Sequence, residues 1–65
     1  MLGPIKPLLI SEREAAALLG VSERTLFNMR KDGQIPFQRM RGRIMYRVSA
    51  MEEWLREREQ RANAR

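Results

Sequence analysis

The sequence contains neither cysteine nor histidine among its 65 residues, and its aromatic residues are only two Phe, one Tyr and one Trp. Without cysteine there is no disulfide and no thiolate metal site, and nothing points to an oxidising compartment. Without histidine, imidazole zinc sites and histidine general bases are excluded as well. A chain of this length forms one domain near the lower size limit for a self-sufficient core. We therefore expect neither an enzyme nor a bound cofactor.

The chain also lacks an apolar run near the ~20 residues that a membrane-spanning helix needs. The stretch from Met1 to Ile10 is partly apolar, but Pro4 and Pro7 interrupt it and no small-residue cleavage site follows. We therefore expect a short extended lead-in over residues 1–7, not a signal peptide, and a cytoplasmic protein.

Basic residues outnumber acidic residues by 13 to 8, which gives a formal net charge of +5. The excess is confined to residues 24–48, which hold seven basic side chains and a single acidic one. The seven basic residues are Arg24, Arg30, Lys31, Arg39, Arg41, Arg43 and Arg47. A one-sided basic block is the electrostatic footprint of a nucleic-acid-binding surface. The alternative is a solvated basic face that keeps the protein soluble.

Two short helices joined by a tight turn are predicted in the first half of the chain. In the segment 11–19, Ser11 and Glu14 have the spacing of a capping box that starts a helix. Gly20 suits the left-handed conformation that ends a helix, and a second serine opens the segment 22–32. This is the helix-turn-helix pattern, whose second helix can enter a DNA major groove. An ordinary helical hairpin packed into a core has the same pattern.

A β-hairpin is predicted after the second helix, because a proline prevents the helix from resuming and an alternating apolar pattern follows. The expected strands cover residues 37–40 and 44–48, and Gly42 suits the tight turn between them. Arginines flank the turn, so the hairpin is either a polar turn kept soluble by charge or a wing that contacts phosphates or the minor groove. The basic side chains of this predicted wing are Arg39, Arg41, Arg43 and Arg47.

A third helix is predicted to begin at Ser49, with Glu52 completing a second capping box. Met51, Trp54 and Leu55 form an apolar stripe at helical spacing. We expect this helix to complete the core, with Trp54 as part of that core and not as a ligand-stacking residue.

The second helix has its apolar residues on one side, whereas Arg24, Asn28 and Lys31 lie within roughly 60° of one another on the opposite side. Arginine and asparagine are the side chains that read guanine and adenine edges through paired hydrogen bonds. Lys31 near the helix end suits a phosphate. Thr25 either binds a phosphate at the helix N-terminus or takes part in local capping. Phe27 borders this face or packs under the hairpin.

The predicted fold is therefore α+β and mainly helical: two helices of a helix-turn-helix, a two-stranded hairpin wing and a C-terminal helix. We expect a single winged helix-turn-helix domain over residues 1–65, with its core at 8–57 and fraying at 60–65.

The chain resembles the excisionase-type winged helix-turn-helix domains, small relatives of the MerR DNA-binding domain, over about residues 8–57. The residues that carry the resemblance are Leu9-Ile10-Ser11, Glu14-Ala15-Ala16, Leu18-Leu19-Gly20-Val21-Ser22, Arg24-Thr25-Leu26, Gly33-Gln34-Ile35-Pro36, Ser49 and Glu52-Glu53-Trp54-Leu55. The resemblance implies a second helix in the major groove, a wing contact and cooperative assembly along bent DNA. By position, it assigns Arg24, Asn28 and Lys31 to the recognition helix, and Arg41 and Arg43 to the wing.

Within that family, such chains are recombination directionality factors of phages and integrative elements, or small transcription regulators. The first hypothesis is thus an excisionase that binds and bends double-stranded DNA near an integrase attachment site, with the integrase and further copies of itself as partners. The second is a transcription regulator that occupies a promoter. The third is a protein-interaction adaptor whose basic hairpin binds an acidic partner. No membrane partner is expected.

Overall fold

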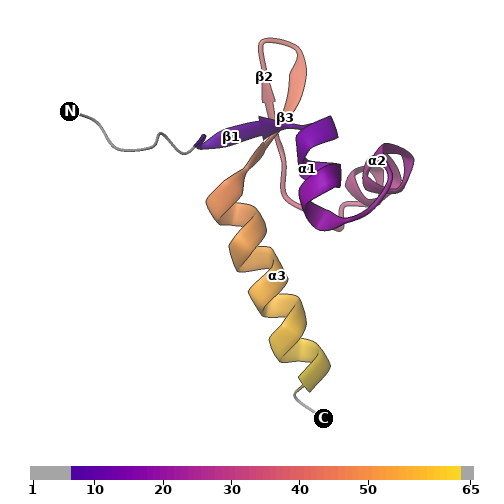
Figure 1. Ribbon diagram of the computed structural model, residues 1–65, viewed down its shortest axis with the longest axis vertical. Coiled ribbons are helices and arrows are strands. Elements are labelled where there is room, and N and C mark those ends of the chain that lie inside the picture. Colours follow the sequence, from indigo (N-terminus) through magenta and orange to yellow (C-terminus); the bar gives the residue numbers. More distant parts are fainter. Residues whose placement is uncertain (1–6, 64–65) are drawn as a thin grey trace, which may run out of the picture.

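A computed structural model describes residues 7–63 of the chain (Figure 1). Its elements are β1 (Leu9–Ser11), α1 (Glu12–Leu19), α2 (Glu23–Lys31), β2 (Gln38–Met40), β3 (Arg43–Arg47) and α3 (Val48–Asn63). The predicted mainly helical α+β fold is confirmed, and its arrangement is that of a winged helix-turn-helix. Residues 1–6, which include most of the predicted lead-in, and the end of the expected fraying segment lie outside the described residues.

Local capping starts and ends the two helices of the helix-turn-helix as predicted. The Ser11 side chain accepts a hydrogen bond from the backbone N–H of Glu14 at 3.1 Å, and the Glu14 carboxylate accepts one from the N–H of Ser11 at 3.0 Å. Gly20 takes the left-handed conformation with φ +75°, and the following N–H of Val21 donates to the Ala16 carbonyl. The side chain of Ser22 then caps α2. Each cap satisfies backbone groups that the helix itself leaves unpaired.

The three strands form one antiparallel sheet in the order β1-β3-β2. The prediction of a two-stranded hairpin was incomplete, because Leu9–Ser11 pairs with β3 as a third strand, with Ile10 opposite Tyr46. Three residues are too few to show an alternating pattern in the sequence. Pairing with β3 places Ile10 in the core, where its side chain is only 4% exposed.

The wing is a tight hairpin between β2 and β3, in which Met40 pairs with Arg43 across a turn of two residues. Both turn residues have positive φ, +52° at Arg41 and +77° at Gly42. This is the backbone that matches the twist of the flanking strands. β2 begins one residue later than the predicted strand 37–40, and β3 both begins and ends one residue earlier than the predicted strand 44–48.

The start predicted for the third helix is wrong. β3 runs directly into α3, which begins at Val48, so Ser49 lies inside the helix and is not its N-cap. The backbone N–H of Val48 donates to the carbonyl of Leu8 at 3.0 Å, beside the β1–β3 pairing. A carbonyl of the N-terminal segment therefore accepts the first backbone N–H of α3, and the helix does not begin at the predicted capping box of Ser49 and Glu52.

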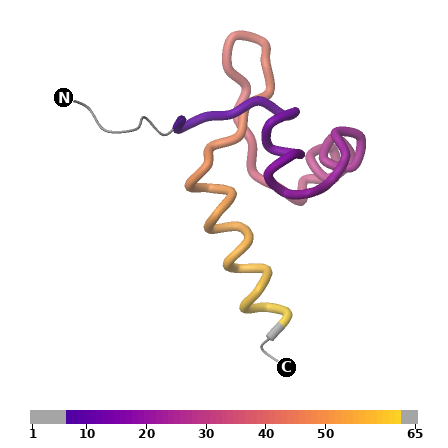
Figure 2. Tube along the Cα trace, in the orientation of Figure 1, coloured from indigo at the N-terminus to yellow at the C-terminus, as the bar shows by residue number. Residues whose placement is uncertain are grey.

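The core lies where α1, α2 and the start of α3 meet one face of the sheet. Its buried members are Ile10, Ala15, Ala16, Leu26, Ile35, Tyr46 and Met51. Trp54 packs against this cluster and its indole N–H donates to the carbonyl of Gln34, so its predicted core role is confirmed. Leu55 is 43% exposed, contrary to the predicted stripe. Figure 2 shows the orange-to-yellow tube of α3 running away from the other elements toward its C-terminal end.

Candidate nucleic-acid interface

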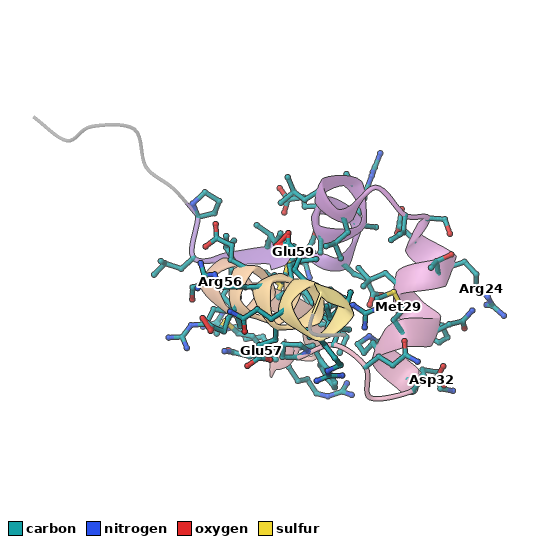
Figure 3. The ribbon with its side chains drawn as sticks, turned by 90° about the horizontal axis from the view of Figure 1, so that it is seen from below. Arg24, Met29, Asp32, Arg56, Glu57 and Glu59 are labelled. Carbon is teal, nitrogen blue, oxygen red and sulfur yellow. The ribbon has the colours of Figure 1, made fainter. Side chains whose placement is uncertain are left out.

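The outward side of α2 carries the three predicted recognition residues. Arg24, Asn28 and Lys31 are all exposed, whereas Leu26 is fully buried on the opposite side of the helix. Figure 3 shows Arg24 pointing away from the molecule and Met29 pointing inward. The caps of α2 and the burial of Leu26 set this rotation, so the polar side chains of the helix face solvent together.

Thr25 lies at the start of α2 and takes part in local capping. Its backbone N–H donates to the Ser22 side chain at 3.0 Å, and the Ser22 hydroxyl donates to the Thr25 hydroxyl at 2.9 Å. Of the two roles open to Thr25, capping is the one the structure shows. The hydroxyl is also exposed at the helix N-terminus, so its proton can still be donated outward.

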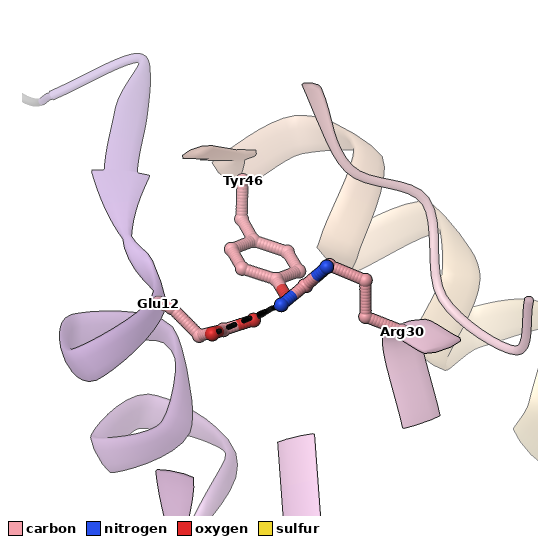
Figure 4. A network of polar contacts seen from close by, with 3 residues as sticks. All are labelled: Glu12, Arg30 and Tyr46. Carbon is pink, nitrogen blue, oxygen red and sulfur yellow. Dashed lines mark hydrogen bonds and ion pairs between the residues drawn. The ribbon is translucent and has the colours of Figure 1, made fainter. Parts of the chain in front are cut away.

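Arg30 belongs to the basic block in the sequence but not to the outward surface. Its Nε lies 2.8 Å from Oε2 of Glu12, and its side chain is only 13% exposed. The Tyr46 hydroxyl donates to the same carboxylate oxygen at 2.6 Å (Figure 4). Together the three side chains join α1, α2 and β3. No spacing in the sequence signals this network, because its members are 18 and 34 residues apart.

The network keeps its charges in defined states. The hydrogen bond from the Arg30 guanidinium lowers the pKa of Glu12 below its ordinary value of 4.5. Burial raises the pKa of Tyr46 above its ordinary value of 10.0, and the hydrogen bond to the Glu12 carboxylate raises it further. At neutral pH the carboxylate is therefore ionised and the phenol is a neutral donor. Arg30 is used to hold α2 in place and not as a free basic group.

Phe27 borders the outward side of α2, and the Arg30 side chain lies close to its ring and to the ring of Phe37. The Arg30 guanidinium carbon lies 5.0 Å from the centroid of the Phe27 ring and 5.6 Å from that of Phe37. Phe27 is therefore a half-buried ring at the border of the outward side, and packing under the hairpin stays a prediction.

The four predicted wing arginines are all exposed, but they do not share one face. Arg39 lies opposite Ile44, and Ile44 and Tyr46 point toward the helices. Because side chains alternate along a strand, Arg43 and Arg47 point to the opposite face of the sheet. Arg41 lies at the tip of the hairpin, in the turn. The wing therefore presents arginine on both of its faces and at its end.

Apart from Arg30, the basic side chains of α2 and the hairpin have no acidic partner among residues 7–63. Within residues 7–63, the ion pairs are Arg30 with Glu12 and Arg56 with Glu53. Six of the seven basic residues between 24 and 48 are thus exposed and unneutralised, and the one acidic residue of that segment, Asp32, lies at the end of α2. Exposed positive charge on a protruding helix and hairpin favours a polyanionic partner.

A family model described as a helix-turn-helix domain matches residues 9–59, which includes α1, α2, the wing and most of α3. The chain belongs to this helix-turn-helix domain family. Membership of the family identifies the chain as a DNA-binding domain, and the exposed basic surface of α2 and the hairpin agrees with that activity. Comparisons with curated proteins and with solved structures gave no match.

Two further findings concern the described part of this helix-turn-helix domain. None of its helices between residues 7 and 63 is long and apolar enough to cross a membrane. Over the same stretch, acidic side chains nowhere gather in a group that could hold a metal ion.

Proposed function

We propose that this helix-turn-helix domain recognises a specific sequence of double-stranded DNA by placing α2 in the major groove. The observation that carries the proposal is the exposure of Arg24, Asn28 and Lys31 on one side of α2, opposite the buried Leu26 and without an acidic partner among residues 7–63. An arginine can pair with the O6 and N7 of guanine, and an asparagine with the N6 and N7 of adenine. Lys31 supplies a phosphate contact, and Thr25 a second one at the helix N-terminus.

The hairpin supplies contacts of a different kind. Arg41 at the tip and Arg39 on the helix side of the sheet bind phosphates or the narrow minor groove next to the site of α2. Arg43 and Arg47 add positive charge from the other face of the wing. These contacts position the protein on the duplex but read few base edges.

In the cell, we propose that the domain acts as an excisionase that bends DNA near an integrase attachment site. Support comes from the resemblance to excisionase-type domains over residues 8–57. The integrase and neighbouring copies of the chain would be its partners on DNA. A transcription regulator that occupies a promoter would use the same interface.

Affinity and specificity for DNA test the interface directly. If about five basic side chains contact phosphates, the logarithm of the association constant should fall linearly with the logarithm of the salt concentration, with a slope of about −4 to −5. Arg24→Ala and Asn28→Ala should each reduce discrimination between the selected site and its point variants by about 1–3 kcal/mol. Lys31→Ala is the control, since it should weaken binding to all duplexes alike. Full sequence preference in the folded Arg24 and Asn28 variants would contradict the assignment of α2 as the reading helix.

The cellular role requires a separate experiment. Footprinting across the DNA that flanks the protein's own gene should protect repeated sites beside an integrase attachment site, and adding the protein should favour excision over integration. Protection of a promoter alone would support the regulator instead.

A further inference from the structure

We propose that Phe27 is a positioning residue of the DNA interface, whose ring holds the side chains of Arg24 and Lys31 on the outward side of α2. This inference rests on the proposed function, because the two cations are candidate DNA contacts. The ring has no hydrogen-bonding group of its own. The cations that surround the ring are Arg24, Arg30 and Lys31.

The contacts around the ring are direct. The guanidinium carbon of Arg24 lies 5.7 Å from the centroid of the Phe27 ring, and the Nζ of Lys31 lies 5.6 Å from it. Arg24 comes three residues before Phe27 and Lys31 four residues after it, which are the spacings at which side chains on a helix are neighbours. A cation within about 6 Å of an aromatic face is attracted by the quadrupole of the ring. One ring therefore restrains both ends of the proposed recognition surface.

The ring is itself held from the interior of the protein. The guanidinium of Arg30 lies 5.0 Å from the Phe27 centroid, and Glu12 anchors that guanidinium at 2.8 Å. Arg30 is largely buried, whereas Arg24 and Lys31 are exposed. Glu12 in α1 thus anchors Arg30, and Arg30 lies against the ring of Phe27. The ring in turn contacts the two outward cations.

Restraint of this kind increases affinity because long basic side chains lose much conformational freedom when they bind. Side chains that are already restricted in the free protein lose less of it on binding. Each cation–π contact at an exposed site corresponds to about a two- to fivefold change in an equilibrium constant. Loss of the ring should therefore weaken binding through both cations.

The first experiment compares Phe27→Leu, which removes the ring, with Phe27→Tyr, which keeps it. In the free protein, NMR should show ring-current shifts on the side-chain protons of Arg24 and Lys31 in the wild type and in Phe27→Tyr, and their loss in Phe27→Leu. Affinity for a duplex selected from a random pool by the wild-type protein should fall about fivefold in Phe27→Leu and stay unchanged in Phe27→Tyr. Phe37→Leu is the matched control, because Phe37 contacts Arg30 alone among these cations.

The second experiment tests whether Phe27 acts through the cations. In the double variant Arg24→Ala/Lys31→Ala, adding Phe27→Leu should cause no further loss of affinity. An undiminished loss in that background would mean that the ring contacts DNA itself, and would overturn the proposal. If a folded Phe27→Leu protein kept the wild-type chemical shifts of the Arg24 and Lys31 side-chain protons, the proposal would be overturned as well. Phe27→Met replaces Phe27→Leu if the melting temperature shows that the latter does not fold.

Failure of the proposed function gives a different result. A wild-type protein that binds no duplex contradicts DNA recognition, whereas the NMR shifts of the free protein still decide whether Phe27 positions the two cations.

Discussion

The guanidinium of Arg30 lies against Glu12 and between two phenylalanine rings, so one basic residue of seven in the 24–48 block has a structural role. The carboxylate that holds it also accepts the hydrogen bond of Tyr46. A partly buried charge is stable only when it is paired and hydrogen-bonded. The three residues therefore depend on one another, and changes at any of them should alter folding before they alter DNA recognition.

Replacement of the carboxylate tests this network. Glu12→Gln should lower the free energy of unfolding at pH 7 by about 1–3 kcal/mol, because Arg30 loses its ionic partner and Tyr46 its charged acceptor. Because the pKa of Glu12 is lowered in the folded state, its contribution is present above the ordinary value of 4.5 and declines as pH falls through the lowered pKa. Denaturant titrations of wild type and variant should therefore converge in acid. Glu57→Gln, on the exposed surface of α3, is the control.

Ionisation of Tyr46 should lower the free energy of unfolding at alkaline pH. Its raised pKa means that the folded state favours the neutral phenol, so its contribution is complete below the ordinary value of 10.0 and is lost as pH rises above it. Thermal melts between about pH 8 and 11 should show the wild type losing stability more steeply than Tyr46→Phe. Parallel curves for the two proteins would show that the phenol titrates as if it were in solvent.

At the scale of the elements, the hairpin turn holds Arg41 in a backbone conformation that is unfavourable for it. Arg41 has a φ of +52°, a left-handed value that costs a residue with a Cβ roughly 1–2 kcal/mol. Asparagine before glycine is the preferred pair for such a turn. An arginine at this position is unfavourable for the hairpin but places a guanidinium at its tip.

Arg41→Asn separates these two effects. The melting temperature should stay unchanged or rise, because asparagine fits the turn before Gly42 better. Affinity should fall by a similar factor on selected and unrelated DNA, and the magnitude of the salt slope should decrease by about one unit. Arg41→Lys, which keeps the charge, should retain most of the slope. An Arg41→Asn protein with unchanged affinity would show that the tip does not contact DNA.

At the scale of the whole molecule, the sheet decides which wing arginines lie on the side of the helices. Arg39 shares the face of Ile44, toward α1 and α2, whereas Arg47 is on the opposite face, beside Leu9 of β1. We expect a duplex that contacts α2 and the hairpin together to meet the first of these faces. The two arginines are equivalent in the sequence pattern but not in the fold.

Alanine substitutions at the two positions should therefore differ. Arg39→Ala should weaken DNA binding and reduce the magnitude of the salt slope by about one unit, since a phosphate contact is lost. Arg47→Ala should have a clearly smaller effect, while both proteins keep the wild-type melting temperature. Filter binding or fluorescence anisotropy at several salt concentrations measures the difference. Equal effects of the two substitutions would contradict the orientation proposed for the wing.

The sequence by itself determined the features that depend on neighbouring residues. Serine caps, the glycine at the end of α1 and the turn at Gly42 act within about four residues, so their spacing predicts the two helices and the hairpin. Helical periodicity likewise predicts that Arg24, Asn28 and Lys31 share one side of α2. The family match over residues 9–59 agrees with this local pattern.

Only the tertiary structure decided the features that depend on distant partners. Leu9–Ser11 becomes a strand because β3 is beside it, and the N–H of Val48, where α3 starts, donates to the distant Leu8 carbonyl. Arg30 leaves the basic surface because Glu12, 18 residues away, pairs with it. Such contacts form only when the fold brings segments together, and a single sequence carries no spacing rule for them.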